Sequence, residues 1–275
     1  MNEKKEFKPY NSMYNASRYF FRVFYPDNWD VSAEPYGFLL NEEGLVLELS
    51  TDGTYYIVAG IGNCAETDIV IPKTYKSKPV SEISSSAFYE NDKITSVVIP
   101  DSINKIGDSA FHYAKKLASV TIGKGVILIE EIAFYGCESL TDISVSTENT
   151  AYKSIDGNLY TIDGKFLIQY AIGKTDIAFN IPDGVTVINS DAFCNCDNLT
   201  EVTIPDSVTN IGDSAFAGCS ELRKLTMGSG VTTIGEHAFV ICSSLESVVL
   251  PNSVKIIGNY AFYECSSLKN VYCKA

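Results

Sequence analysis

The dipeptide Ala-Phe returns at a fixed interval through most of this 275-residue chain, and that interval constrains the fold more than any other feature. Its phenylalanine stands at Phe88, Phe111, Phe134, Phe193, Phe216, Phe239 and Phe262. The spacing is 23 residues except for one step of 59, which equals two repeats plus 13 extra residues. Repeats of this length form solenoids, in which one unit cannot bury its apolar side alone and stacks on its neighbours.

The first part of each repeat predicts a short β-strand. In the copy that begins at Leu199, Val202 and Ile204 are apolar and alternate with Thr203, which is the period of a strand with one buried face. Pro205 follows and ends the strand, because proline has no N–H to extend a ladder. Stacked copies place these strands side by side in a sheet.

The second part of the repeat returns the chain beneath that sheet. Val208 and Ile211 supply apolar contacts, and Asp213 or Ser214 is suited to cap one short helical turn. Phe216 then fills the interior. The predicted fold class is therefore a repeat solenoid, mainly β with short helical turns.

This repeated pattern resembles the BspA-like leucine-rich repeat family, a 23-residue type found in surface proteins of gut and oral bacteria and some protozoa. The resemblance runs from about Leu45 to the C-terminus and implies a leucine-rich-repeat right-handed superhelix with β-hairpin insertions. It places one insertion at about 146–178, where Asp163-Gly164 is a strong hairpin signal in its own right. Asp52-Gly53 resembles the entry hairpin of the family.

Residues 1–40 do not match the repeat, so the solenoid domain is assigned to 41–275. The segment is rich in aromatic residues and holds the only tryptophan, Trp29. We expect it to be an N-terminal cap that covers the edge of the first repeat. The alternative is the remnant of a preceding ligand-binding domain. A third interpretation is an enzyme whose activity is housed in residues 1–40 together with the first repeats.

The chain carries 21 basic and 34 acidic side chains, a formal charge of −13. Because such a surface repels nucleic-acid phosphates and anionic lipids, we expect no nucleic-acid partner. No apolar run reaches the roughly 18 residues of a membrane helix, so no membrane insertion is expected. Residues 1–10 are polar and charged and do not begin a signal peptide. Either the protein stays inside the cell, in the cytoplasm, or an export leader has been removed.

Five of the eight cysteines occupy one position of the repeat, three residues after its phenylalanine. They are Cys137, Cys196, Cys219, Cys242 and Cys265. The spacing predicts a buried ladder of free thiols that pack as small apolar groups, because parallel side chains are poorly oriented for disulfides. A ladder also lacks the tetrahedral convergence of a zinc site, so no metal is expected. Cys194 is expected to be partly exposed.

No motif predicts catalysis or a cofactor. The two histidines, His112 and His237, have no partner set by spacing, and the Asp-Gly pairs lack the pattern of a calcium loop. Glycine-rich nucleotide-binding motifs are missing as well. We therefore expect no catalytic residue, no cofactor and no enzyme.

The outward positions of the predicted strands form two columns of mainly small, polar side chains. Candidate binding residues in these columns are Asp142, Ser144, Glu201, Thr203, Lys224, Thr226, Ser247, Asn270 and Tyr272. The columns lack the Trp, Tyr and Arg cluster of an interaction hot spot, so an ordinary solvated sheet face is an equal interpretation. Tyr152, Tyr160 and Tyr170 in the insertion are alternative contact residues, although hairpin tyrosines often pack against their own sheet.

The sequence stops on a predicted strand that includes Tyr272 and Cys273. An uncapped solenoid end exposes a ladder edge and apolar core. We therefore expect either a longer repeat protein or pairing of this end with another molecule, self-association included.

The resemblance implies a non-enzymatic protein-binding or adhesion module that is exported and displayed on a bacterial surface. Its partner would be a protein or glycan on host or neighbouring cells. The second interpretation is a structural spacer that holds another domain away from the cell. Composition and spacing alone do not decide between the two.

Overall fold

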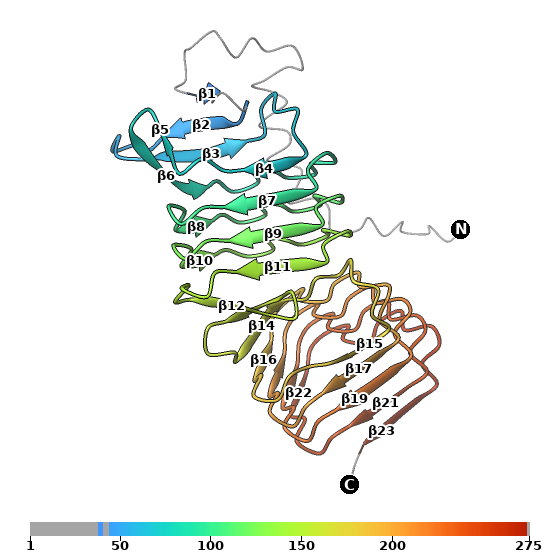
Figure 1. Ribbon diagram of the computed structural model, residues 1–275. Coiled ribbons are helices and arrows are strands. Elements are labelled where there is room, and N and C mark those ends of the chain that lie inside the picture. The colour runs from blue at the N-terminus through green and yellow to red at the C-terminus, as the bar shows by residue number, and fades with distance from the viewer. Residues whose placement is uncertain (1–37, 41–43, 274–275) are drawn as a thin grey trace, which may run out of the picture.

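The computed structural model describes residues 38–40 and 44–273 as a β-solenoid (Figure 1). The expected cap at residues 1–40 lies outside the described residues, apart from strand β1 (Phe38–Leu40). A typical turn contributes a four-residue strand to one face, a two-residue strand to a second face and a tight phenylalanine-bearing turn to the third. The predicted solenoid with β-hairpin insertions is confirmed.

The four-residue strands form what we call the broad face. In the first stack of turns (β2 to β11) this face is a parallel sheet with the order β11-β9-β7-β4. Its strands are β4 (Asp68–Val70), β7 (Ser96–Ile99), β9 (Ser119–Ile122) and β11 (Asp142–Val145). In the second stack (β14 to β23) they are β15 (Ala178–Asn180), β17 (Glu201–Ile204), β19 (Lys224–Met227), β21 (Ser247–Leu250) and β23 (Asn270–Cys273). Inward Val202 is fully buried, whereas Thr203 is partly exposed, which is the predicted alternation.

The two-residue strands form a second sheet, the narrow face, where the sequence predicts only a returning segment. In the first stack β6 (Lys78–Ile83) pairs in parallel with β8 (Lys105–Ile106), and β8 pairs with β10 (Leu128–Ile129). In the second stack the strands are β14 (Phe166–Gln169), β16 (Val187–Ile188), β18 (Asn210–Ile211), β20 (Thr233–Ile234) and β22 (Ile256–Ile257). One inward isoleucine per short strand, such as Ile211, anchors this sheet to the core.

The N-terminal end of the solenoid is built from antiparallel strands. β2 (Val46–Leu49) and β3 (Tyr56–Gly60) form the entry hairpin predicted from Asp52-Gly53, and Gly53 has a φ of 71° in its turn. A second hairpin, β5 (Thr74–Tyr75) with β6, was not predicted. Its turn residues Lys76 and Ser77 both have positive φ, at 44° and 63°, without the glycine that usually marks such a turn.

The predicted short helical turns are wrong, because the part of the chain that the structure describes contains no helix. Residues two positions before and after each repeat phenylalanine have positive φ; around Phe216 these are Ser214 (53°) and Gly218 (72°). As a result every second N–H group donates to a carbonyl oxygen of the next turn, and the N–H groups between them donate within their own turn. Phe216 N donates to Ala238 O of the next turn at 2.8 Å, while Ala217 N donates to Ser214 O at 3.0 Å.

Stacked aromatic rings fill the interior on the third side. Phe216 lies with its ring centroid 4.6 Å from that of Phe193 and 5.1 Å from that of Phe239, with nearly parallel planes. In the insertion, Tyr170 takes the place of a repeat phenylalanine and stacks on Phe193 at 4.8 Å. The buried apolar residues fall into two separate clusters, one in each stack. The strands of the two stacks run at an angle to each other (Figure 1).

The junction between the stacks contains the hairpin β12 (Tyr152–Ile155) and β13 (Asn158–Thr161). Buried Asn149 fastens this hairpin to the last turn of the first stack. Its Nδ2 donates to Gly123 O at 3.0 Å and to Val126 O at 2.9 Å, and its Oδ1 accepts from the N–H groups of Ala151 and Tyr152, both at 2.8 Å. One amide therefore satisfies four backbone groups in a place where the repeat pattern is interrupted.

Strand β13 contributes side chains to both cores. Leu159 belongs to the apolar cluster of the first stack, whereas its neighbour Tyr160 belongs to that of the second. Tyr152, Tyr160 and Tyr170 are all buried, so the structure does not present these three tyrosines as surface contact residues. The Tyr152 hydroxyl instead accepts a hydrogen bond from Ile129 N at 2.9 Å, at the outer edge of the first narrow-face sheet.

Two tight turns meet across the junction. The Cys194 thiol donates to the Tyr135 hydroxyl at 3.3 Å, and Cys194, expected to be partly exposed, is only 6% exposed. Asp191 lies in the same turn as Cys194. Burial, helped by the carboxylates of Asp213 and Glu131, raises the pKa of Asp191 from 3.8 to about 6.

This raised pKa predicts a pH-dependent cost in stability. The favourable contribution of protonated Asp191 is complete below pH 4 and is lost as the pH rises through about 6. Asp191→Asn should therefore raise the free energy of unfolding by about 1–2 kcal/mol at pH 7.5 and have little effect near pH 4. Asparagine also tolerates the φ of 58° at this position. Urea denaturation at both pH values measures the change in the free energy of unfolding. Exposed Asp183→Asn is the control. Equal effects of Asp191→Asn at the two pH values would contradict the prediction.

Candidate binding face

The candidate binding residues divide between the two stacks. Seven of them lie on the broad face of the second stack, and we call their surface the second-stack face: Glu201, Thr203, Lys224, Thr226, Ser247, Asn270 and Tyr272. Pairing register brings Glu201 beside Lys224 and Thr203 beside Thr226. Ser247 likewise lies beside Asn270. These side chains are exposed except for Glu201 and Thr203, which are partly exposed.

Asp142 and Ser144 do not join this surface, so the expectation of one continuous pair of columns is wrong. Both residues lie on β11, which ends the broad-face sheet of the first stack. On its outer side, Ile143 N donates to Gly157 O in the turn of the junction hairpin at 2.9 Å. The hairpin thus occupies the edge where the next solenoid strand would pair, and Ser144 Oγ donates to Asp142 Oδ2 at 2.6 Å.

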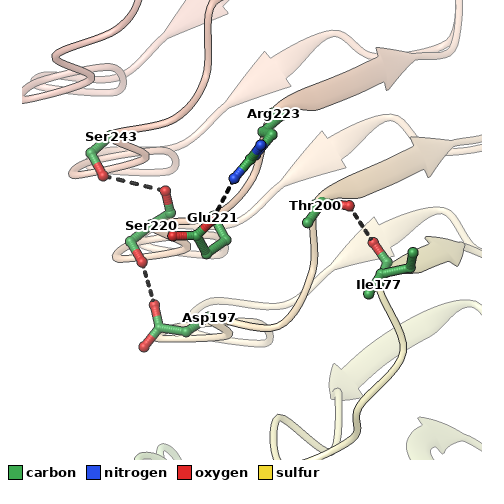
Figure 2. Close-up of polar contacts among 7 residues, drawn as sticks. All are labelled: Ile177, Asp197, Thr200, Ser220, Glu221, Arg223 and Ser243. Atoms are coloured by element: carbon green, nitrogen blue, oxygen red, sulfur yellow. Dashed lines mark hydrogen bonds and ion pairs between the residues drawn. The ribbon is translucent and has the colours of Figure 1, made fainter.

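Charges on the second-stack face are paired locally. Lys224 Nζ forms an ion pair with Glu201, with side chains 64% and 39% exposed. Beside them, Arg223 donates to Glu221 Oε2 at 2.9 Å, as Figure 2 shows. Because each cation has an anionic neighbour, this face is polar without a strong field of one sign, although the whole chain carries −13.

A row of polar side chains borders the face at the corner before each broad strand (Figure 2). Ser220 Oγ donates to Asp197 Oδ1 at 2.7 Å, and Ser243 Oγ donates to Ser220 O at 3.3 Å. Thr200 Oγ1 donates to Ile177 O at 2.9 Å. Each bond joins one turn to the next and fixes the corner in place. This row was not predicted; its signal in the sequence is a polar residue four positions after the repeat phenylalanine, as at Asp197, Ser220 and Ser243.

The five cysteines at one repeat position lie buried and free in the structure. In four of them the thiol donates to the carbonyl oxygen of the phenylalanine one turn earlier, at 3.0–3.2 Å. Burial raises the pKa of Cys137 and of Cys196 to about 12. Cys137 and Cys196 are therefore protonated at neutral pH and are poor nucleophiles and metal ligands.

The histidines lie on the phenylalanine side, away from the second-stack face. His112 is buried among the rings of Tyr89, Tyr113 and Tyr135, and burial lowers its pKa to about 4. His237 stacks on Tyr260 with ring centroids 5.3 Å apart. Within residues 44–273 no three His, Cys, Asp or Glu side chains are grouped to hold a metal ion. The described residues also include no helix long and apolar enough to cross a membrane.

Stacked turns with a parallel broad face, a ladder of buried leucine-type residues and hairpin insertions define a leucine-rich repeat solenoid. A family model described as the BspA type leucine rich repeat region matches residues 62–161 and 174–275 in six copies. The chain therefore belongs to the BspA-type leucine-rich repeat family, as the resemblance indicated.

Solved structures share the fold. The pneumococcal vaccine antigen PcpA is 19% identical, with a TM-score of 0.61 over 87% of this chain and 82% of that one. A leucine rich cell surface protein from Faecalibacterium prausnitzii is 22% identical, with a TM-score of 0.50 over 89% of this chain and 96% of that one. A leucine-rich repeat protein from Bacteroides ovatus is 26% identical, with a TM-score of 0.51 over 86% and 53%. Among curated proteins no relative matched the chain.

Proposed function

We propose that this protein is a non-enzymatic binding module of a bacterial surface or secreted protein, and that it contacts its partner through the second-stack face. The observation that carries the proposal is the set of exposed and partly exposed polar side chains held in register on two strand pairs, β17 with β19 and β21 with β23. A solenoid holds such an array rigid, so little conformational entropy is lost when a partner binds.

Family membership supports the choice of partner. BspA-type repeats imply attachment to a protein or glycan on host or neighbouring cells, and one structural relative is named a cell surface protein. Small hydroxyl and amide side chains such as Thr226, Ser247 and Asn270 offer hydrogen-bond donors and acceptors to either kind of partner. In this proposal residues 41–275 are the binding domain and residues 1–40 a separate N-terminal region.

A charge-exchange variant tests the face. In Glu201→Lys with Lys224→Glu the ion pair and the net charge are kept, but the polarity of the pair is reversed. We expect this double variant to weaken binding to the partner by about 10-fold or more, because each reversed side chain then faces a partner group of the same charge. The measurement is a screen of the purified chain against matrix proteins, cell-surface proteins and glycans, followed by titration of each saturable hit.

The matched control exchanges another exposed pair on the first stack, Lys115→Glu with Glu138→Lys, whose charged atoms lie 2.6 Å apart. Its binding should be unchanged. An equal loss of affinity in both double variants would show that the contact lies elsewhere or that binding is nonspecific. A screen without any saturable hit would favour the spacer interpretation.

A further inference from the structure

Three buried polar groups lie beside strand β13, at the first layer of the second stack. They are the side-chain nitrogen Nδ2 of Asn158 and the hydroxyls of Tyr160 and Tyr170, and all three side chains are 0% exposed. In the described part of the chain none of these groups has a hydrogen-bond partner. Buried polar groups are costly to leave unpaired, and nearly all of them in folded proteins bind protein or ordered water. We call these three groups the junction polar cluster.

Strand pairing brings the three side chains to one side of β13. Asn158 and Tyr160 are alternate residues of this strand and flank Leu159, whose side chain belongs to the core of the first stack. The antiparallel register of β13 and β14 sets Asn158 opposite Tyr170, and directly opposed residues point to the same side of a sheet. Both tyrosines accordingly belong to the core of the second stack. Asn158 Oδ1 accepts from Ala171 N at 3.0 Å, so the amide is held in place with Nδ2 as its remaining donor group.

The chemistry of the cluster selects a neutral ligand that both accepts and donates hydrogen bonds. An amide nitrogen only donates, whereas a phenol hydroxyl does both. Burial, helped by the carboxylate of Asp156, raises the pKa of Tyr160, and burial, helped by that of Asp176, raises the pKa of Tyr170. Both hydroxyls are therefore protonated at neutral pH. The same two carboxylates repel an anion, and the cluster contains no charged group that could balance a buried cation.

We propose that the junction polar cluster is a buried hydration site, in which ordered water molecules accept from Asn158 Nδ2 and form hydrogen bonds with the hydroxyls of Tyr160 and Tyr170. Water is the smallest molecule with the required chemistry, and fully buried side chains leave no access for a larger ligand. A bridging water is enthalpically nearly as good as a direct hydrogen bond. These waters join β13 to the core of the second stack where the register of β13 and β14 shifts, between Leu159 and Tyr160.

The test removes the two hydroxyls and keeps both rings, in Tyr160→Phe with Tyr170→Phe. Oxygen-17 magnetic relaxation dispersion counts the water molecules that stay bound for longer than the protein takes to tumble. We expect the double variant to hold fewer such waters than the native chain. Its equilibrium constant for folding, measured by urea denaturation, should fall about fivefold, because hydrogen bonds to water are lost. The control is Tyr152→Phe, since the buried Tyr152 hydroxyl already accepts from Ile129 N; it should lose no long-lived water.

A high-resolution crystal structure gives a second readout. A water oxygen should lie about 2.7–3.2 Å from Asn158 Nδ2. An unchanged number of long-lived waters in the double variant would overturn the proposal. So would a double variant more stable than the native chain, because deleting buried hydroxyls that bind nothing is stabilising. Direct hydrogen bonds among the three side chains in the crystal would overturn it as well.

Discussion

Replacing Phe216 with alanine is expected to destabilise the second stack by about 3–5 kcal/mol. Phe216 is fully buried between the rings of Phe193 and Phe239, and its removal leaves a cavity whose walls are held in place by hydrogen bonds between turns. The measurement is urea denaturation followed by circular dichroism, with the midpoint and slope compared with those of the native chain.

Two further variants make this test specific. Phe262 stacks on Phe239 and is itself only partly buried, so Phe262→Ala should cost less than Phe216→Ala. Phe111→Ala removes an equally buried ring from the apolar cluster of the first stack. Because the two cores are separate, Phe111→Ala and Phe216→Ala should each speed hydrogen exchange most in the stack that holds the substituted residue. Identical exchange patterns in the two variants would contradict the division into two cores.

Asn149→Ala should cost about 2–4 kcal/mol, although it removes only one small side chain. The substitution deprives two backbone carbonyls and two backbone N–H groups of their partner in a buried place, and unsatisfied buried groups are costly. The loss should appear first as faster hydrogen exchange in β12 and β13, which Asn149 fastens to the first stack.

Exposed Asn104→Ala is the control for this prediction, since it removes the same amide from the surface of the first stack. It should change the free energy of unfolding by less than about 0.5 kcal/mol. If Asn149→Ala were equally mild, water would have to replace the amide at these four backbone groups, and the junction would be less tightly closed than the structure indicates.

The solenoid and its broad face follow from the sequence because their determinants recur at a fixed spacing. Val202 and Ile204 alternate with Thr203, and the same alternation recurs in other copies of the repeat. A wrong strand assignment in one copy is therefore corrected by comparison with the other copies. The tight turn was mispredicted as helical for a local reason. Ser214 does not reveal a positive φ in its side chain, and the carboxylate of Asp213 accepts from Glu236 N of the next turn, at 2.7 Å, instead of capping its own.

The junction and the binding residues are less predictable for a physical reason. The 13 extra residues break the register, and nothing in the repeat indicates that Asn149 satisfies four backbone groups or that β13 contributes side chains to both cores. Asp142 was grouped with Glu201 on spacing alone, but the hairpin turn at Gly157 occupies the strand edge between them. Tertiary contacts of an irregular segment decide both outcomes.

The hydrogen bonds that run from each turn to the next also determine how the molecule responds to tension. A pull along the solenoid axis acts on one inter-turn layer after another, so the terminal turn peels away before its neighbours are strained. Each turn that detaches releases 23 residues, about 75 Å of extended chain. We expect a protein of this construction to lengthen in steps under load, and the four hydrogen bonds of Asn149 must break before the junction hairpin can detach from the first stack.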